Sequence, residues 1–133
     1  MTSTAPQETP STISTPAVLY ICAERAGTST LATERATEEG HAFAQKHALR
    51  IVTTITDLYG EPVPQKRGGW MRVRQMAERG EVEVEVAIVR WPNALSPHHE
   101  LRYPELDHLR QHSCQILFSW APLAVMVGAG ATR

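Results

Sequence analysis

The chain has 133 residues and a formal net charge of −1, from 13 Lys and Arg against 14 Asp and Glu. This length fits one domain, and the near-neutral charge excludes a strongly basic, histone-like polyanion binder while leaving room for a local basic patch. No apolar run approaches the roughly 20 residues of a membrane-spanning helix, and no basic region with an apolar stretch opens the chain. We therefore expect a cytoplasmic protein without a secretory signal or a membrane partner. Two cysteines, Cys22 and Cys114, are too few for a disulfide scaffold, so free thiols are expected.

The N-terminal part begins with a polar tail and then alternates strand and helix patterns. Residues 1–16 are almost entirely Thr, Ser, Pro, Ala, Gln and Glu, which predicts a disordered tail before a folded domain over 17–133. The apolar run over 17–23 predicts a strand buried on both faces. A stripe at three- and four-residue spacing then predicts an amphipathic helix from about 30 to 48, through Ala32, Ala36, Gly40, Phe43 and His47.

The same alternation continues to residue 120. In chain order, the patterns predict a β-branched strand over 50–58, a loop over 59–69, a helix from Trp70 to Gly80, a strand over 84–91, a loop between Pro92 and Pro97, a helix from 98 or 104 to 112 with Pro104 allowed in its first turn, and a strand over 115–120. Residues 121–133 receive no firm assignment. The order β-α-β-α-β-α-β predicts an α/β fold, an open, mostly parallel sheet of four to five strands with helices on both faces.

In an open parallel sheet, ligands bind outside the carboxyl ends of the strands. Glu24 and Arg25 end the first predicted strand, Asp57 ends the second and Asn93 follows the third, so these side chains should converge on one edge. Glu24, Asp57 and Asn93 offer the oxygen ligands that Mg²⁺ prefers. Carboxylates at such an edge are common without a metal, so we favour solvated residues that cap the strand-to-helix turns, and no cofactor is expected.

Four stretches carry a further pattern. They are Tyr20-Ile-Cys-Ala-Glu24, Asp57-Leu-Tyr-Gly-Glu61, Arg67-Gly-Gly-Trp70 running on to Gly80, and Asn93-Ala-Leu-Ser-Pro97. In spacing and hydrophobic pattern the chain resembles, over nearly all of residues 17–120, the catalytic domain of resolvase/invertase-type serine recombinases. That family carries Tyr-x-Arg-x-Ser on its first strand, Asp-x-x-Ser-Gly after its second, an Arg that begins a helix ending in Gly, and Asp-Arg-Leu-x-Arg after an apolar strand. The resemblance implies a resolvase-like domain with flavodoxin-like layering.

The chemistry of that family does not fit this chain. There, a serine attacks a DNA phosphodiester while clustered arginines stabilise the charge that develops on phosphorus. Tyr20, Asp57 and Arg67 match the family pattern here. The positions that differ are Cys22 for the first arginine, Glu24 for the serine, Gly60 for a second serine, Asn93 for an aspartate, and Ala94 and Pro97 for the later arginine pair. The resemblance therefore implies a protein of DNA recombination or mobile elements without strand-exchange activity, acting as a binding or regulatory module or persisting as a remnant.

A basic segment is the candidate DNA contact. Over residues 66–79, Lys66, Arg67, Arg72, Arg74 and Arg79 crowd one predicted loop and helix, and the first four are the candidate contacts to backbone phosphates. Three glutamates follow directly, at positions 81, 83 and 85, so a solvated charged face is the competing interpretation. The family resemblance is the main argument for DNA.

The histidines invite a zinc hypothesis. His108 and His112 stand one helical turn apart, with His98, His99 and Cys114 near in sequence. The spacing does not spell out four ligands, so surface histidines are favoured.

Two other sets of residues have simple structural explanations. Ser29 lies five residues past the nucleophile position, but no activating base is suggested near it, and helix capping by Ser29 or Thr30 is favoured. Trp70 and Trp91 are interpreted as packing residues.

Two alternative functions stay open. One is a small Mg²⁺-dependent phosphoryl-transfer enzyme that uses Glu24 and Asp57. The other is a protein–protein interaction domain that binds a partner protein or a second copy of this chain.

Overall fold

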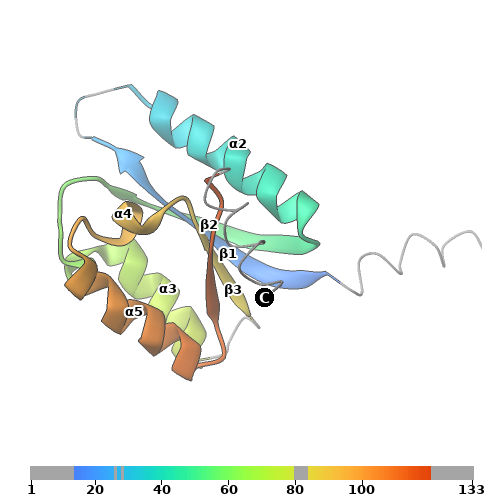
Figure 1. Cartoon of the computed structure of the whole chain (residues 1–133). Helices are drawn as coiled ribbons and strands as arrows, with labels where there is room; N and C mark the ends of the chain where they lie inside the picture. Colours follow the sequence, from blue (N-terminus) through green and yellow to red (C-terminus); the bar gives the residue numbers. More distant parts are fainter. Residues whose placement is uncertain (1–13, 26, 28, 80–83, 121–133) are drawn as a thin grey trace, which may run out of the picture.

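Four parallel strands form one sheet at the centre of the domain (Figure 1). The computed structural model describes residues 14–120 apart from 26, 28 and 80–83. The strands are β1 (Thr15–Glu24), β2 (Leu49–Leu58), β3 (Val86–Val89) and β4 (Gln115–Phe118), in the order β2-β1-β3-β4 across the sheet. β1 pairs in parallel with both β2 and β3, so the strand with the continuous apolar run lies in the interior of the sheet.

Helices cover both faces of this sheet. On one face lies α2 (Leu31–Lys46), and on the other lie α3 (Gly68–Arg79), α4 (Pro92–Leu95) and α5 (His99–Gln111) (Figure 1). A short 3-10 helix, η1 (Pro64–Lys66), precedes α3. The predicted α/β class, with a parallel sheet between helices, is confirmed.

The alternation of side chains along β1 divides the core into two parts. Successive residues of a strand point to opposite faces. Leu19 and Ile21 therefore pack under α2, whereas Tyr20 and Cys22 pack on the side of α3 and α5. Both sets are buried, which explains why the sequence of β1 is apolar throughout rather than alternating.

α2 approaches the sheet closely at Gly40. A Cβ built on this glycine would lie 2.6 Å from Cδ1 of Leu19, which is itself buried. The buried residues of α2 are Ala36, Gly40, Phe43 and Ala44. The ends of the predicted stripe are corrected, because Ala32 and His47 are exposed.

The predicted limits of the first and third strands are also corrected. Thr15 and Pro16 belong to β1 rather than to the tail, because their backbone is tied to neighbouring segments: Thr15 N donates to the Ala48 carbonyl (3.0 Å), and the Pro16 carbonyl accepts from Glu85 N (3.1 Å). β3 is shorter than the predicted 84–91, since its pairing with β4 spans only Val86–Val89. The rest of the predicted tail, residues 1–13, and the unassigned segment 121–133 lie outside the described residues.

Two predicted loops contain short helices. η1 lies within 59–69, and α4 occupies most of the segment between Pro92 and Pro97. α3 starts at Gly68, two residues before the predicted Trp70, and its predicted end at Gly80 lies outside the described residues. α5 starts at His99, so Pro104 lies inside the helix and not in its first turn. Proline there removes one helical N–H donor, a loss that the exposed face of α5 tolerates because water can reach the unpaired carbonyl.

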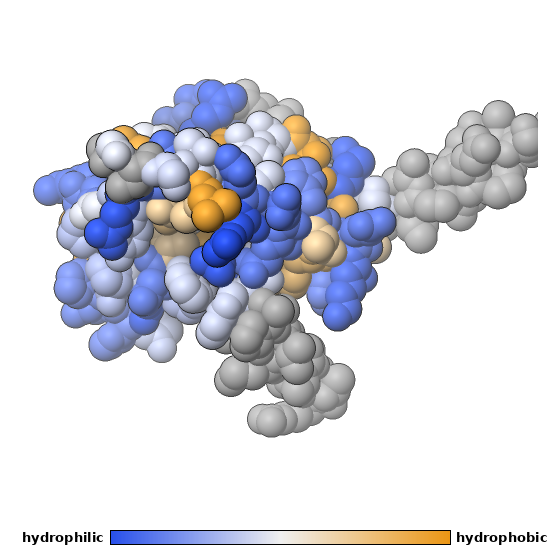
Figure 2. All heavy atoms as spheres, turned by 90° about the horizontal axis from the view of Figure 1, so that it is seen from above, coloured by the Kyte–Doolittle hydropathy of each residue, from blue (hydrophilic) through white to orange (hydrophobic). Residues whose placement is uncertain are grey.

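The described surface is mainly polar. In the view of Figure 2, hydrophilic residues dominate and hydrophobic ones gather in small separate areas. The large apolar side chains that are exposed among the described residues are Leu31, Leu58 and Tyr103. No helix in the described part of the chain has the length and apolar character needed to cross a membrane.

The close contact between α2 and β1 predicts that Gly40→Val destabilises the domain. The added side chain must displace Leu19 from its buried position, and such overpacking costs about 1–3 kcal/mol. Ala42→Val is the matched control, because Ala42 is an exposed position on the same helix and its cost is limited to helix propensity, below about 0.7 kcal/mol. Urea unfolding of both variants measures the difference, and equal free energies of unfolding would show that the contact at Gly40 is not limiting.

Candidate functional site

The three residues that match the family pattern meet in one hydrogen-bonded network. The Tyr20 hydroxyl, on β1, donates to Oδ2 of Asp57 at the end of β2 (2.7 Å). Nη1 of Arg67 donates to the Tyr20 hydroxyl (3.4 Å). Tyr20 and Arg67 are 47 residues apart in sequence, so only the folded sheet brings these groups together. We call these residues the Tyr20–Asp57–Arg67 network.

Asp57 caps the start of α3. Its Oδ1 accepts from Gly69 N (2.8 Å) and its Oδ2 from Trp70 N (2.9 Å), two backbone donors that the first turn of a helix leaves without helical partners. A carboxylate at this end also interacts favourably with the helix dipole. Gly69 allows the approach, because a Cβ there would lie 2.7 Å from both carboxylate oxygens. The cap explains why α3 starts before Trp70.

Arg67 is held inside the protein by its partners. Only 4% of the residue is exposed. Its Nε donates to the Glu61 carbonyl (2.8 Å), and its Nη1 donates to the Ala94 carbonyl of α4 as well as to Tyr20. These contacts tie the loop after β2 to α4 and β1. A DNA phosphate on the surface would reach this guanidinium only if α4 or the loop moved.

A second buried group, Glu105, connects α5 to the same region. It is 2% exposed, and its carboxylate accepts from Trp70 Nε1 (2.6 Å) and Gln65 Nε2 (3.2 Å). Arg74 Nη1 lies 3.6 Å from its Oε1 and supplies a positive charge. Sequence reasoning missed Glu105, although its spacing of four residues from both Leu101 and Leu109 places it on the inner stripe of α5.

Burial favours the neutral form of the Tyr20 hydroxyl and of both thiols. It raises the pKa of the Tyr20 hydroxyl well above its usual value, with the neighbouring Cys22 and Asp57 adding to the rise and Arg67 opposing it. Burial also raises the pKa of Cys22, and Arg67 again opposes the rise. For Cys114 burial raises the pKa to about 11. Both cysteines are buried and free, so neither thiol is set up as a nucleophile.

Glu24, the residue at the family's nucleophile position, also has a hydrogen-bond partner within the protein. Glu24 lies at the end of β1, where its Oε1 accepts from Thr33 Oγ1 of α2 (3.4 Å). Asn93 is exposed and its Oδ1 accepts from Arg102 Nη1 (2.8 Å). Ala94 is buried. The remaining two replaced positions, Gly60 and Pro97, are exposed.

The candidate magnesium ligands have separate partners. Asp57 accepts three hydrogen bonds from protein groups, and Glu24 and Asn93 each accept one from a different helix. Across the residues that the structure describes, no group of three or more His, Cys, Asp or Glu side chains is arranged to hold a metal ion. A cation at Asp57 would have to displace the cap of α3.

The histidine set predicted from spacing is divided between the two ends of α5. His98 and His99 lie at its start and His108 and His112 at its end, roughly 14 Å away at the helical rise per residue. His108 Nε2 contacts Oε2 of Glu78 on α3 (2.5 Å), and Cys114 is buried at the start of β4. The fold therefore does not bring the five residues together.

Of the four candidate DNA contacts, two lie on the surface. Lys66, in η1, and Arg72, on α3, are exposed. Arg67 is in the network, and Arg74 points toward Glu78 (3.9 Å) and Glu105 (3.6 Å). A phosphate-binding surface in this region would therefore depend on Lys66 and Arg72.

The remaining candidates from the sequence, Ser29, Trp70 and Trp91, make contacts with other parts of the protein. Ser29 is exposed, and its Oγ accepts weakly from Leu31 N (3.4 Å) at the start of α2, next to the N-cap residue Thr30. Trp70 is fully buried with its ring edge-on to Tyr20, at 5.1 Å between centroids. Trp91 packs edge-on against Trp120 (5.2 Å). Both tryptophans are therefore packing residues, as predicted.

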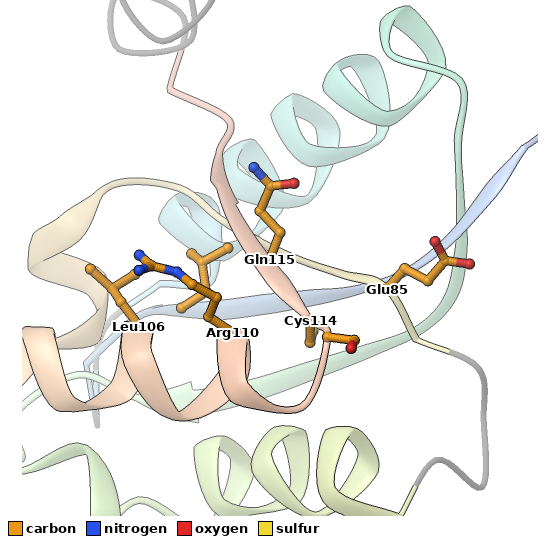
Figure 3. A pocket seen from close by; sticks show the side chains of 7 residues that line it. Glu85, Leu106, Arg110, Cys114 and Gln115 are labelled. Atoms are coloured by element: carbon orange, nitrogen blue, oxygen red, sulfur yellow. The ribbon is translucent and has the colours of Figure 1, made fainter. Parts of the chain in front are cut away.

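Two pockets lie at opposite ends of the strands. The larger, about 510 Å³, lies at the amino ends of β3 and β4, where Glu85, Arg110 and Gln115 are among its lining residues (Figure 3). The smaller, about 250 Å³, lies at the carboxyl ends of β1 and β3 beside α2. We call it the β1–β3 pocket. Its position is the one where open parallel sheets bind ligands.

Comparison with solved structures identifies the fold. The chain is similar to the C-terminal catalytic domain of ISC1926 TnpA, an IS607-like serine recombinase, with a TM-score of 0.68 and 14% identity over 79% of this chain and 70% of that chain. It is also similar to the N-terminal catalytic domain of TP901-1 integrase (TM-score 0.59, 14% identity, 87% of this chain and 94% of that one). A third similar structure is a resolvase family site-specific recombinase from Streptococcus pneumoniae (0.61, 15%, 89% and 86%).

These likenesses confirm the predicted resolvase-like fold. No protein-family model matches the sequence, and a search of curated proteins gave no significant match. At 14–15% identity the likeness establishes the architecture, and the chemistry of the site has to be argued from this chain's own residues.

The cap of α3 predicts that two adjacent glycines respond in opposite ways to substitution by alanine. Gly69→Ala pushes the new methyl group into the Asp57 carboxylate and should lower the free energy of unfolding by about 1–3 kcal/mol. In Gly68→Ala the methyl group meets open space, so the change should be at most about 1 kcal/mol, in the stabilising direction. Thermal or urea unfolding of the pair gives the comparison.

The pair shares sequence context and helix position, so a general intolerance of the loop to change cannot mimic the result. Equal destabilisation of both variants would mean that Asp57 does not approach the helix as closely as the hydrogen bonds indicate.

Proposed function

We propose that this chain is a serine-recombinase-fold domain that contacts DNA through its surface and does not exchange strands. The observation that carries the proposal is the set of hydrogen bonds made by the three residues that match the family pattern. Tyr20, Asp57 and Arg67 bond to one another and to the backbone of the loop, α3 and α4. Their presence in the sequence is explained by the fold alone.

The side chains at the carboxyl edge of the sheet do not supply the groups that strand exchange needs. A phosphodiester attack needs an activated nucleophile and positioned cations around the phosphorus. Glu24 brings a carboxylate to the nucleophile position, which repels a phosphate, and Cys22 and Ala94 bring no charge. Loss of a single stabilising group of this kind typically costs about 10²–10³ in rate, and here several differ together.

Duplex contact is supported by the fold and by two exposed cations. Lys66 and Arg72 lie in η1 and on α3, adjacent elements on one face of the domain. Cations on a surface bind backbone phosphates without reading sequence and release counterions, which makes the affinity depend on salt. With a net charge of −1 the chain has no general attraction to DNA, so binding should depend on this local surface.

Fluorescence anisotropy of a labelled duplex, at low and physiological salt, tests the proposal. The double variant Lys66→Ala/Arg72→Ala should bind more weakly, and its slope of log K against log salt should be shallower by about 1.8, or 0.9 per lost phosphate contact. Arg35→Ala, which removes an exposed arginine from α2 on the opposite face of the sheet, is the control and should leave the slope unchanged.

Two results would contradict the proposal. Absence of binding at low salt would exclude a DNA contact by this chain. A covalent protein–DNA product, detected on a denaturing gel after incubation with supercoiled plasmid or nicked duplex, would show that strand cleavage survives without the serine.

A further inference from the structure

The carboxylate of Glu105 connects the two elements that carry the exposed cations of the proposed DNA surface. Lys66 lies in η1 and Arg72 on α3, whereas Glu105 lies on α5, which packs beside both elements (Figure 1). Its Oε2 accepts from Nε2 of Gln65 (3.2 Å), the residue directly before Lys66. Its Oε1 accepts from Nε1 of Trp70 (2.6 Å), two residues before Arg72. One carboxylate from a third element therefore joins η1 to α3.

The α3 side of this connection is firmly held. Trp70 is fully buried, and Arg74, one helical turn further along α3, places its Nη1 3.6 Å from Oε1 of Glu105. Glu105 is 2% exposed, so water competes little for these contacts and they are stronger than the same contacts on the surface. α3 thus fixes the carboxylate in one position, from which its second oxygen reaches η1.

The η1 side of the connection acts on an exposed part of the chain. Gln65 and Lys66 are exposed, and η1 is a single turn of three residues, Pro64–Lys66. A 3-10 turn has poorer hydrogen-bond geometry than an α-helix, so it depends more on outside contacts. Of the three side chains of η1, that of Gln65 makes the hydrogen bond to another helix. The place of Lys66 relative to α3 is therefore set in part by Glu105.

We propose that Glu105 is a positioning residue for DNA binding, which holds Lys66 in place relative to Arg72 before a duplex arrives. The inference rests on the proposed function, since it concerns the same two cations. A cation on a segment that moves must be ordered when it binds a phosphate, and that ordering weakens binding; a cation already in place avoids this loss. Because Glu105 is buried, it acts through its partners and not by contact with DNA.

The salt dependence of duplex binding, measured by fluorescence anisotropy, distinguishes positioning from direct contact. A lost phosphate contact makes the slope of log K against log salt shallower by about 0.9. Loss of positioning leaves both cations present, so the slope stays the same while the Kd rises. Gln65→Met, which removes only the amide, should raise the Kd about 2- to 10-fold with the slope unchanged. Gln45→Met, at an exposed position of α2 on the opposite face of the sheet, is the matched control and should change neither.

Glu105→Met fills a similar space without the carboxylate. It should raise the Kd at least as much as Gln65→Met, although it removes a formal negative charge, which on its own would favour DNA. It also leaves the buried indole N–H of Trp70 unpaired and should lower the free energy of unfolding, so binding is measured at a temperature where urea unfolding shows the variant to be folded.

A double variant tests whether the two residues act as one connection. Gln65→Met/Glu105→Met should bind DNA no more weakly than Glu105→Met alone, because either change breaks the same bond. Additive losses of affinity would show that Gln65 contacts DNA itself.

Amide hydrogen exchange of the free protein tests the positioning without DNA. The amides of Lys66 and Arg67 bond to the carbonyls of Val63 and Pro64 in this turn. In Gln65→Met and in Glu105→Met they should exchange about 2- to 10-fold faster, whereas the amides of β1 in Gln65→Met should not change. If the wild-type protein does not bind a duplex, the proposed function fails, and the exchange result still decides whether Glu105 holds η1.

Three results would overturn the inference. The first is an unchanged Kd in Gln65→Met when the wild-type protein binds the duplex, which would leave Glu105 a purely structural role. The second is a shallower salt slope in Gln65→Met. The third is unchanged exchange at Lys66 and Arg67 in both variants.

Discussion

The carboxylate of Asp57 is the group on which one whole side of the domain depends. It accepts hydrogen bonds from the Tyr20 hydroxyl and from the first free backbone donors of α3, so it joins the central strand, an edge strand and a helix at one point. The Tyr20 hydroxyl then accepts from Arg67, whose other donors hold the loop after β2 and α4. Because these groups are buried or half-buried, each would lose more by being left unpaired than it gains from any one bond, which makes the network cooperative.

That network changes how the likeness to recombinases is understood. A shared tyrosine, aspartate and arginine would ordinarily be taken as remains of a catalytic site. In this chain Arg67 is almost fully buried and Asp57 is occupied by a helix cap, so the three residues are needed to build the domain whether or not it reacts with DNA. The side chains of Cys22, Glu24 and Ala94, where the family pattern has the serine and arginines, take no part in the bonds of this network. Stability therefore accounts for the matching positions, and reactivity would have depended on the others.

The sequence predicted the layers of this fold better than their junctions. Apolar runs and the stripe of α2 report burial directly, so the strands, their parallel arrangement and the helices on both faces could be predicted. The spacing of Glu105 on α5 marked it as an inward position, but its role could not be predicted, because a glutamate is ordinarily exposed and its partners Trp70 and Gln65 are 35 and 40 residues away. The basic segment has the same difficulty, because sequence proximity groups Lys66, Arg67, Arg72 and Arg74 although their partners are distant in sequence. Backbone carbonyls and the Tyr20 hydroxyl hold Arg67 inside the protein, and the carboxylate of Glu105 draws Arg74 inward.

The edge of the sheet shows a redistribution of charge with a physical consequence. The family pattern places guanidiniums where this chain has Cys22 and Ala94, whereas here the positive charge lies on Arg25 and Arg90, each against an aromatic ring. Cations inside a site serve to stabilise charge that develops during a reaction, since they act at the reacting atom in a water-poor environment. In this chain the guanidinium of Arg90 is paired with Glu39 and stacked on Trp91, so part of the positive charge at this edge is already balanced within the protein.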